Sequence, residues 1–142
     1  MRAGFSGRPA SGFTLVELCV VLAITGVLAA IAWPSWQSHL QRSRRADAVV
    51  ALMRVQMAQE SFRANNGLYA AQLHGLRGAS STRSGQGLYD IEIVAATGDR
   101  YVARARARAD SLAAGDADCA VMSVMVREGV AEFAPSSRCW NR

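Results

Sequence analysis

The sequence predicts an α+β protein in which a long N-terminal transmembrane α-helix packs on a four-stranded antiparallel β-sheet. Three observations predict this fold: an apolar run near the N-terminus, a helix-forming segment directly after it, and four alternating runs in the C-terminal half. The 142 residues suit one ordinary domain. We divide them into a leader (1–12), an apolar helix (13–36), its amphipathic continuation (37–66) and a β-sheet head (67–142).

Residues 13–33 form an apolar run of 21 residues that contains a single charge, Glu17. As a helix this run spans about 30 Å, the thickness of the hydrocarbon core of a bilayer. A secretory signal would place small residues for cleavage at its end, whereas this run ends in Trp33, Pro34, Ser35 and Trp36. We therefore expect the run to stay on the mature protein as a transmembrane helix, with both tryptophans at the membrane interface.

Glu17 needs a partner in this helix. A carboxylate within a membrane costs about 2.5–3.5 kcal/mol on insertion scales. No basic side chain lies between Phe13 and Trp36. Cleavage before Phe13 would create an α-amine four residues from Glu17, and this amine could neutralise the acid, best from a neighbouring subunit. The alternative is that Glu17 lies near the membrane edge and extends to water.

The sequence GFTLVE (residues 12–17) resembles the prepilin cleavage motif of type IV pilins and type II secretion pseudopilins. The resemblance implies the type IV pilin fold and cleavage by a prepilin peptidase between Gly12 and Phe13. It also implies N-methylation of Phe13 and an assembly charge pair at Glu17. Gly26 and Pro34 match the helix-breaking positions of the family.

Shorter matches give the subgroup. The sequences SRRADA (43–48), NGLY (66–69) and RCW (138–140) resemble PilE-type minor pilins. In type IV pilins a C-terminal disulfide loop is common, so the resemblance adds weight to a pairing of Cys119 with Cys139.

The charges around the apolar run do not favour the orientation that the resemblance implies. Arg42, Arg44 and Arg45 follow the run, whereas Arg2 and Arg8 precede it. A positive-inside count therefore does not favour an N-terminus on the cytoplasmic side. We give the motif more weight, because a cysteine pair near the C-terminus also predicts an exported head.

Residues 35–64 lack glycine and proline and are rich in helix formers, so the helix is expected to continue to the stop signal NNG (65–67). Pro34 is expected to kink it or loosen one turn. At 100° per residue, Asp47, Arg54, Ser61 and Asn65 share a narrow strip, and apolar residues spread over a broad arc. The arc favours contacts with the sheet on one flank and with other subunits on another. The alternative is a helix buried deep within the head.

The head reads as a loop followed by four strands. Residues 67–86 are rich in Gly, Ser and Arg, and the lone His74 there is not expected to bind a metal. Alternating runs follow at residues 88–96, 101–108, 119–126 and 130–133, with turns at 97–100 and 127–129. This spacing predicts two hairpins or a meander, with one face of the sheet on a helix and the other in water.

All sixteen basic residues are arginine. Genomic codon bias explains this composition, and phosphate recognition, to which guanidinium is suited, is the alternative. The net charge is +5, which becomes +3 without the leader residues Arg2 and Arg8. So mild a charge is weak evidence for nucleic-acid binding.

Arg104, Arg106 and Arg108 share one face of a predicted strand. They form either a solvated face, paired with Asp90 and Glu92 on the adjacent strand, or a stripe that binds DNA phosphates or an acidic neighbour. No aromatic residues alternate with them, so the nucleic-acid signal is weak.

Three cysteines predict one pair and one buried thiol, Cys19. Cys119 and Cys139 bracket the last predicted hairpin, and closing this loop would stabilise the head by about 3 kcal/mol. A disulfide requires an oxidising compartment. The alternative is two unpaired thiols.

These observations favour a minor type IV pilin, a structural subunit that primes or joins a pilus for twitching, adhesion or DNA uptake. An enzyme is not expected, because no nucleophile–base pairing, metal-ligand spacing or phosphate loop is present. No cofactor or metal is expected. Before assembly the subunit would be a single-pass inner-membrane protein with a periplasmic head, and after assembly it would be in the extracellular pilus.

The expected partners are other major and minor pilins through the N-terminal helix, the prepilin peptidase, the inner-membrane assembly platform and membrane lipid. A type II secretion pseudopilin is the alternative; some bind calcium, but Asp110, Asp116 and Asp118 make a thin ligand set. A DNA-binding pilin is a further alternative.

Overall fold

The computed structural model describes residues 13–141. The chain forms two compact units, Met1–Gln37 and Ser38–Arg142, and helix α1 (Leu15–Asn66) contributes to both. The end of α1 confirms the predicted stop signal. Gly67 has φ +74° and donates its N–H to the carbonyl of Arg63 at 2.8 Å, which satisfies a carbonyl of the last turn.

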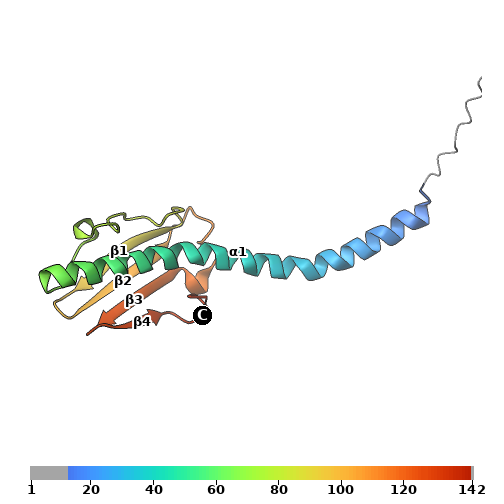
Figure 1. Ribbon diagram of the computed structural model, residues 1–142. Helices are drawn as coiled ribbons and strands as arrows, with labels where there is room; N and C mark the ends of the chain where they lie inside the picture. The colour runs from blue at the N-terminus through green and yellow to red at the C-terminus, as the bar shows by residue number, and fades with distance from the viewer. Residues whose placement is uncertain (1–12, 142) are drawn as a thin grey trace, which may run out of the picture. The chain divides into compact units, whose positions relative to one another are not determined.

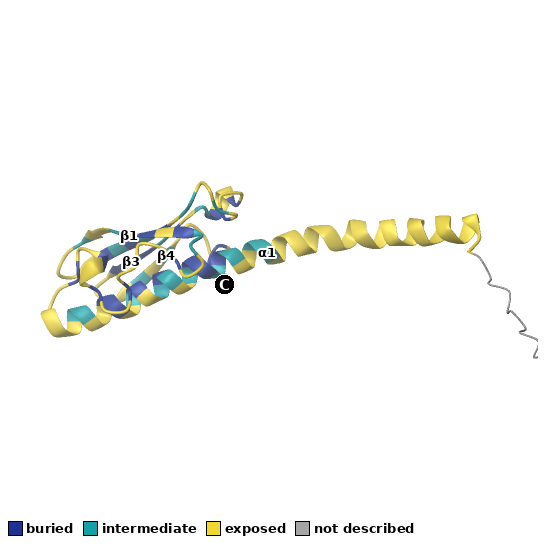
Figure 2. Cartoon of the chain, turned by 90° about the horizontal axis from the view of Figure 1, so that it is seen from above, coloured by how far each residue is buried: buried dark blue, intermediate teal, exposed yellow. Residues whose placement is uncertain are grey.

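In the first unit, α1 is long and apolar enough to cross a membrane, and its most apolar window has no buried residue. Every described residue of this unit is exposed, as the yellow stretch of α1 in Figure 2 shows. Cys19 is exposed too, so the prediction of a buried thiol is wrong for the isolated chain. None of the other described residues of this unit covers it.

The helix is uninterrupted at Gly26 and Pro34. Neither residue ends it, because a proline removes one backbone hydrogen bond and a glycine costs about 1 kcal/mol relative to alanine. The turns on both sides continue the helix. Loosening at these positions inside a packed filament stays a prediction.

The second unit contains one antiparallel sheet in the order β1-β2-β3-β4. Its strands are β1 (Tyr89–Ala96), β2 (Arg100–Ala107), β3 (Val121–Arg127) and β4 (Val130–Ala134). The predicted meander is thereby confirmed, and α1 lies across one face of the sheet (Figure 1).

Two short 3-10 helices interrupt the loops of this unit. One, η1 (Leu73–Gly75), lies in the loop that connects α1 to β1. The other, η2 (Ala117–Cys119), lies just before β3. It takes up Cys119, and β3 therefore begins two residues later than predicted.

The core lies between α1 and the sheet. Strand residues alternate between this core and solvent, which confirms the predicted period of two; the buried ones are Tyr89, Ile91, Tyr101, Ala103, Ala105, Met122, Val124 and Val126. Leu52 and Val55 of α1 pack into the same core. Tyr69, from the loop after α1, meets Tyr101 edge to face with ring centroids 4.8 Å apart.

The faces of α1 in the second unit differ from one another. Leu52 and Val55 are buried, whereas Val50 and Met57 of the same apolar arc are exposed. The alternative of a helix buried deep within the head is therefore wrong. The narrow strip is mixed as well. Asp47 is buried because the loop before β1 covers this end of the strip, and its Oδ1 accepts a hydrogen bond from the backbone N–H of Gln86 at 3.0 Å.

Candidate functional site

The first candidate site is the start of α1. Phe13 is 81% exposed, and Glu17 lies in the first turn of the helix. The hydroxyl of Thr14 accepts a hydrogen bond from the N–H of Glu17 at 3.2 Å and so caps the helix. Gly12, on the other side of the predicted cleavage site, lies outside the described residues.

Glu17 has no basic residue nearby in the sequence. The first arginine after it is Arg42, 25 positions further along the chain. At the N-terminal end of a helix the exposed N–H groups favour a negative charge. Residues 13–37 contain no basic side chain, so a cationic partner for this carboxylate has to come from outside this stretch of the helix.

The second candidate site lies at the end of the head where α1 enters it. Arg42, Arg44 and Arg45 follow the apolar run, and the head holds two of them. Arg44 donates through Nη1 to the carbonyl of Leu112 at 3.0 Å. Arg45 is 3% exposed and binds Asp116. These two arginines therefore hold α1 to the loops of the head.

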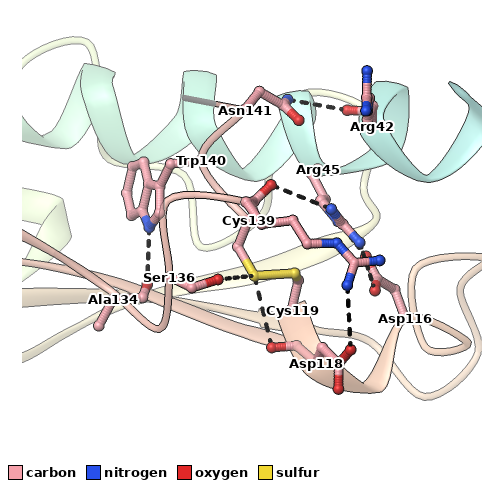
Figure 3. The surroundings of a disulfide bond; sticks show 11 residues. Arg42, Arg45, Asp116, Asp118, Cys119, Ala134, Ser136, Cys139, Trp140 and Asn141 are labelled. Atoms are coloured by element: carbon pink, nitrogen blue, oxygen red, sulfur yellow. Dashed lines mark hydrogen bonds and ion pairs between the residues drawn. A yellow bond between two sulfur atoms is a disulfide. The ribbon is translucent and has the colours of Figure 1, made fainter. Parts of the chain in front are cut away.

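The pair of Arg45 and Asp116 is bidentate. Nη2 of Arg45 donates to Oδ1 at 2.9 Å, and Nε donates to Oδ2 (Figure 3). Nη1 of Arg45 also donates to the carbonyl of Arg138 at 3.3 Å. The hydrogen bond to Asp116 raises the pKa of Arg45 above its usual value, although burial opposes the rise. The guanidinium therefore stays charged and joins α1 to two separate loops.

A disulfide joins Cys119 to Cys139 beside this ion pair (Figure 3). The alternative of two unpaired thiols is therefore wrong. The next residue, Trp140, is 3% exposed and donates through Nε1 to the carbonyl of Ala134 at 2.9 Å. Asn141 donates through Nδ2 to the carbonyl of Arg42 at 3.3 Å. The disulfide and these contacts hold the C-terminal segment against α1.

A hollow of about 340 Å³ lies at this end of the head. We call it the base hollow; its lining residues are Arg42, Ser137, Arg138 and Asn141. Sequence reasoning missed it, because its lining comes from two segments almost a hundred residues apart. The only sequence signal was the arginine cluster directly after the apolar run.

The third candidate site is the arginine stripe on β2. Arg104 lies 3.4 Å from Glu92. Arg108 lies 3.4 Å from Asp90 and 2.7 Å from Asp110.

Arg106 is exposed, and no ion pair joins it to another of the described residues. The structure thus pairs two of the three arginines with acids, which agrees with the expectation of a solvated face paired with neighbouring acids. It leaves one guanidinium available to a ligand.

The three acids considered for calcium are not gathered at one site. Asp116 is bound by Arg45, Asp110 by Arg108, and Asp118 lies 3.9 Å from Arg138. Within residues 13–141, no three His, Cys, Asp or Glu side chains are grouped as a metal site would require.

Two sequence models of protein families match the chain. Residues 34–123 match the family described as "Type IV minor pilin ComP, DNA uptake sequence receptor". Residues 7–33 match the prokaryotic N-terminal methylation motif. The first match covers the C-terminal part of α1, strands β1 and β2 and the start of β3, and the second covers the end of the leader and the apolar run.

Curated relatives include pilins and a secretion protein. Fimbrial protein EcpC of Eikenella corrodens is 32% identical over 104 residues, which cover 73% of this chain and 67% of EcpC. Type IV major pilin protein PilE of Neisseria gonorrhoeae is 33% identical over 82 residues, 58% of this chain and 48% of PilE. Type II secretion system core protein G of Pectobacterium carotovorum is 32% identical over 74 residues, 52% of this chain and 47% of that protein.

This chain therefore spans about half the length of the last two relatives. The pilin relatives are named as structural subunits rather than as enzymes. The long apolar helix packed on a four-stranded antiparallel sheet matches the type IV pilin fold. The chain belongs to the type IV pilin family.

Proposed function

We propose that this chain is a minor type IV pilin, a non-enzymatic subunit that primes or joins a pilus. The observation that carries the proposal is the match of residues 34–123 to a family of minor pilins. In this proposal a prepilin peptidase cleaves after Gly12 and methylates Phe13. The subunit waits in the inner membrane with a periplasmic head and then passes through the assembly platform into an extracellular filament.

The first unit of the chain supports assembly through α1. All of its described side chains are exposed, so its apolar surface is free to contact lipid before assembly and other pilins afterwards. The α-amine of Phe13 on one subunit neutralises Glu17 on its neighbour. An acid left unpaired by a wrong register stays uncompensated in a dry environment, and the pair therefore favours the correct register.

Replacement of Glu17 by valine tests this mechanism. We expect Glu17→Val to insert into the membrane normally but to be lost from sheared pili, as measured by immunoblotting of membrane and pilus fractions. Thr25→Val is the matched control, because the hydroxyl of Thr25 binds the carbonyl of Val21 in its own helix at 2.7 Å. Pilus incorporation of Glu17→Val at the level of Thr25→Val would overturn the charge-pair mechanism.

Mass spectrometry of the mature N-terminus tests the processing step separately. The expected product begins at Phe13 and carries one N-methyl group. A mature chain that retains its first twelve residues, or one that begins beyond Trp36, would contradict the proposal.

DNA binding by the head is a second candidate function, favoured by the description of the matching family as a DNA uptake sequence receptor. Arg106 is the member of the β2 stripe that is free to contact a phosphate, because acids bind Arg104 and Arg108. We expect Arg106→Glu alone to cause most of the loss of duplex affinity that replacing Arg104, Arg106 and Arg108 together by glutamate causes. The measurement is fluorescence anisotropy over a salt series.

The control for DNA binding is Arg77→Glu, in the exposed loop before β1. Equal losses in Arg77→Glu and Arg106→Glu would place the DNA contacts elsewhere than on the stripe.

A secretion pseudopilin is the remaining alternative, favoured by the similarity to core protein G. Co-purification with a secretion apparatus instead of pili would establish it.

A further inference from the structure

The base hollow gathers hydrogen-bond donors and positive charge at one end of the head. Among residues 13–141 its lining comprises two arginines, a serine and an asparagine, none of which is acidic. We propose that this hollow binds the phosphate of an anionic phospholipid headgroup while the subunit is held in the membrane. The proposal rests on the membrane-anchored stage of the proposed function.

The two arginines of the hollow are available to a ligand. Among the described residues, no ion pair involves Arg42. Its backbone carbonyl accepts a hydrogen bond from the side chain of Asn141. Arg138 has one acid nearby, Asp118, at 3.9 Å, and both side chains are more than 70% exposed. So long and exposed a pair is weak, and a phosphate can displace it.

Guanidinium groups suit this ligand. Each presents a planar fork of N–H donors that matches two phosphate oxygens. The hydroxyl of Ser137 adds a donor at the same hollow. The side-chain amide of Asn141 holds the C-terminal segment to the backbone of Arg42, so the hydrogen bond from Asn141 fixes one wall of the hollow relative to the other (Figure 3).

The charge around the hollow is also positive. Among residues 13–141, the charged residues that line the hollow or bind at this end of the head are Arg42, Arg44, Arg45 and Arg138, with Asp116 and Asp118. Four positive and two negative charges leave a balance of +2. Arg45 and Asp116 cancel each other, so the remaining positive charge lies nearer the surface.

The sequence holds the hollow near the membrane, however the two units are arranged. Arg42 follows Trp36 by six residues, which span at most about 20 Å of extended chain and about 9 Å of helix. The headgroup region is several ångströms thick on each side of the hydrocarbon core. Basic residues placed this close to a span attract anionic lipids.

Lipid fits the hollow better than DNA does. One hollow lined by two arginines can hold a single phosphate, whereas a duplex offers a series of phosphates that calls for an extended basic track. A single site beside the anchor matches one headgroup.

Native mass spectrometry of the full chain released from detergent tests the proposal. We expect the wild-type chain to retain phosphatidylglycerol in preference to phosphatidylcholine. The double variant Arg42→Gln/Arg138→Gln should bind phosphatidylglycerol about 25-fold more weakly, about fivefold for each arginine. The control, Arg100→Gln/Arg127→Gln, removes two exposed arginines that face each other across β2 and β3, and should retain the lipid.

Several outcomes would overturn the inference. These are equal retention of both lipids by the wild type, equal losses in the two double variants, and full competition by millimolar inorganic phosphate, which would indicate a site for the free ion. Loss of duplex DNA binding in Arg42→Gln/Arg138→Gln with unchanged phosphatidylglycerol would assign the hollow to DNA. Carbonate extraction of membranes, performed alongside, shows whether the anchor itself has failed.

Discussion

Gln59 and Ala70 form a reciprocal pair of hydrogen bonds. Nε2 of Gln59 donates to the carbonyl of Ala70, and the N–H of Ala70 donates to Oε1 of Gln59, each at 2.8 Å. Gln59 is fully buried, and its amide therefore supplies the partners that the backbone of Ala70 would otherwise lack. The pair directs the chain back along α1 as soon as the helix has ended.

Replacing Gln59 should be costly. Gln59→Met keeps the size of the side chain but leaves one buried N–H and one buried carbonyl without partners, at about 1–3 kcal/mol each. We expect the free energy of unfolding to fall by about 3 kcal/mol. Denaturant titration of the full chain in detergent measures it, with Gln56→Met on the preceding turn, where the side chain is partly exposed, as the control. Similar losses in both variants would contradict the role assigned to Gln59.

The ion pair of Arg45 and Asp116 predicts an asymmetric response to mutation. Asp116→Asn leaves the buried guanidinium of Arg45 uncompensated, and we expect it to lower the free energy of unfolding by about 3 kcal/mol. The double variant Arg45→Met/Asp116→Leu removes both charges and should recover more than half of that loss. Denaturant titration decides, and a double variant less stable than Asp116→Asn would show that the pair is a net source of stability.

Loss of the disulfide should weaken the same end of the head. Replacing Cys119 and Cys139 by serine opens a loop of sequence separation 20 and should lower the free energy of unfolding by about 3 kcal/mol. Trp140 and Asn141 follow Cys139 directly, and their backbone N–H groups donate to the carbonyls of Ser137 at 3.1 Å and Arg138 at 3.4 Å. The hydrogens of these two amides should therefore exchange faster in the variant. The control is Cys19→Ser, in the apolar run, which should change neither quantity.

Three buried tyrosines predict sensitivity to alkaline pH. Burial raises the pKa of Tyr69, Tyr89 and Tyr101, because the charged phenolate is disfavoured away from water. Because its folded-state pKa is raised, each tyrosine contributes fully to the free energy of unfolding below its unfolded-state pKa of about 10. This contribution is lost as the pH rises towards the folded-state pKa. Stability should therefore be flat through neutral pH and fall above about pH 10.

Tyr101→Phe tests the origin of this alkaline loss. The hydroxyl of Tyr101 is buried and has no hydrogen-bond partner among the described residues, so its removal should cost little at pH 7. Above about pH 10, the decline of unfolding free energy with pH should become shallower by up to about 1.4 kcal/mol per pH unit. An unchanged slope would show that Tyr101 does not contribute.

The strands were predictable because local rules determine them. Period-two alternation located all four strands to within two residues, and the glycine at position 67 marked the end of α1. Burial on one face is what produces alternation, and a positive φ is what selects glycine. Both signals are present in a few adjacent residues.

The long-range polar contacts were not predictable. Arg45 and Asp116 lie 71 positions apart, and no periodicity relates them. Asp47 fell on the same helical strip as exposed residues, yet the loop before β1 covers it. Which charges are buried depends on where loops pass, and loop paths are set by tertiary packing rather than by local sequence.

The attachment of the last residues to α1 bears on how the protein can be handled. Trp140 is buried and Asn141 binds the backbone at Arg42, so a purification tag inserted among these residues would break the contacts that shape the base hollow. The tight turn at Glu128 and Gly129 is exposed and joins two strands at their tips. A short epitope inserted there would leave the C-terminal contacts intact.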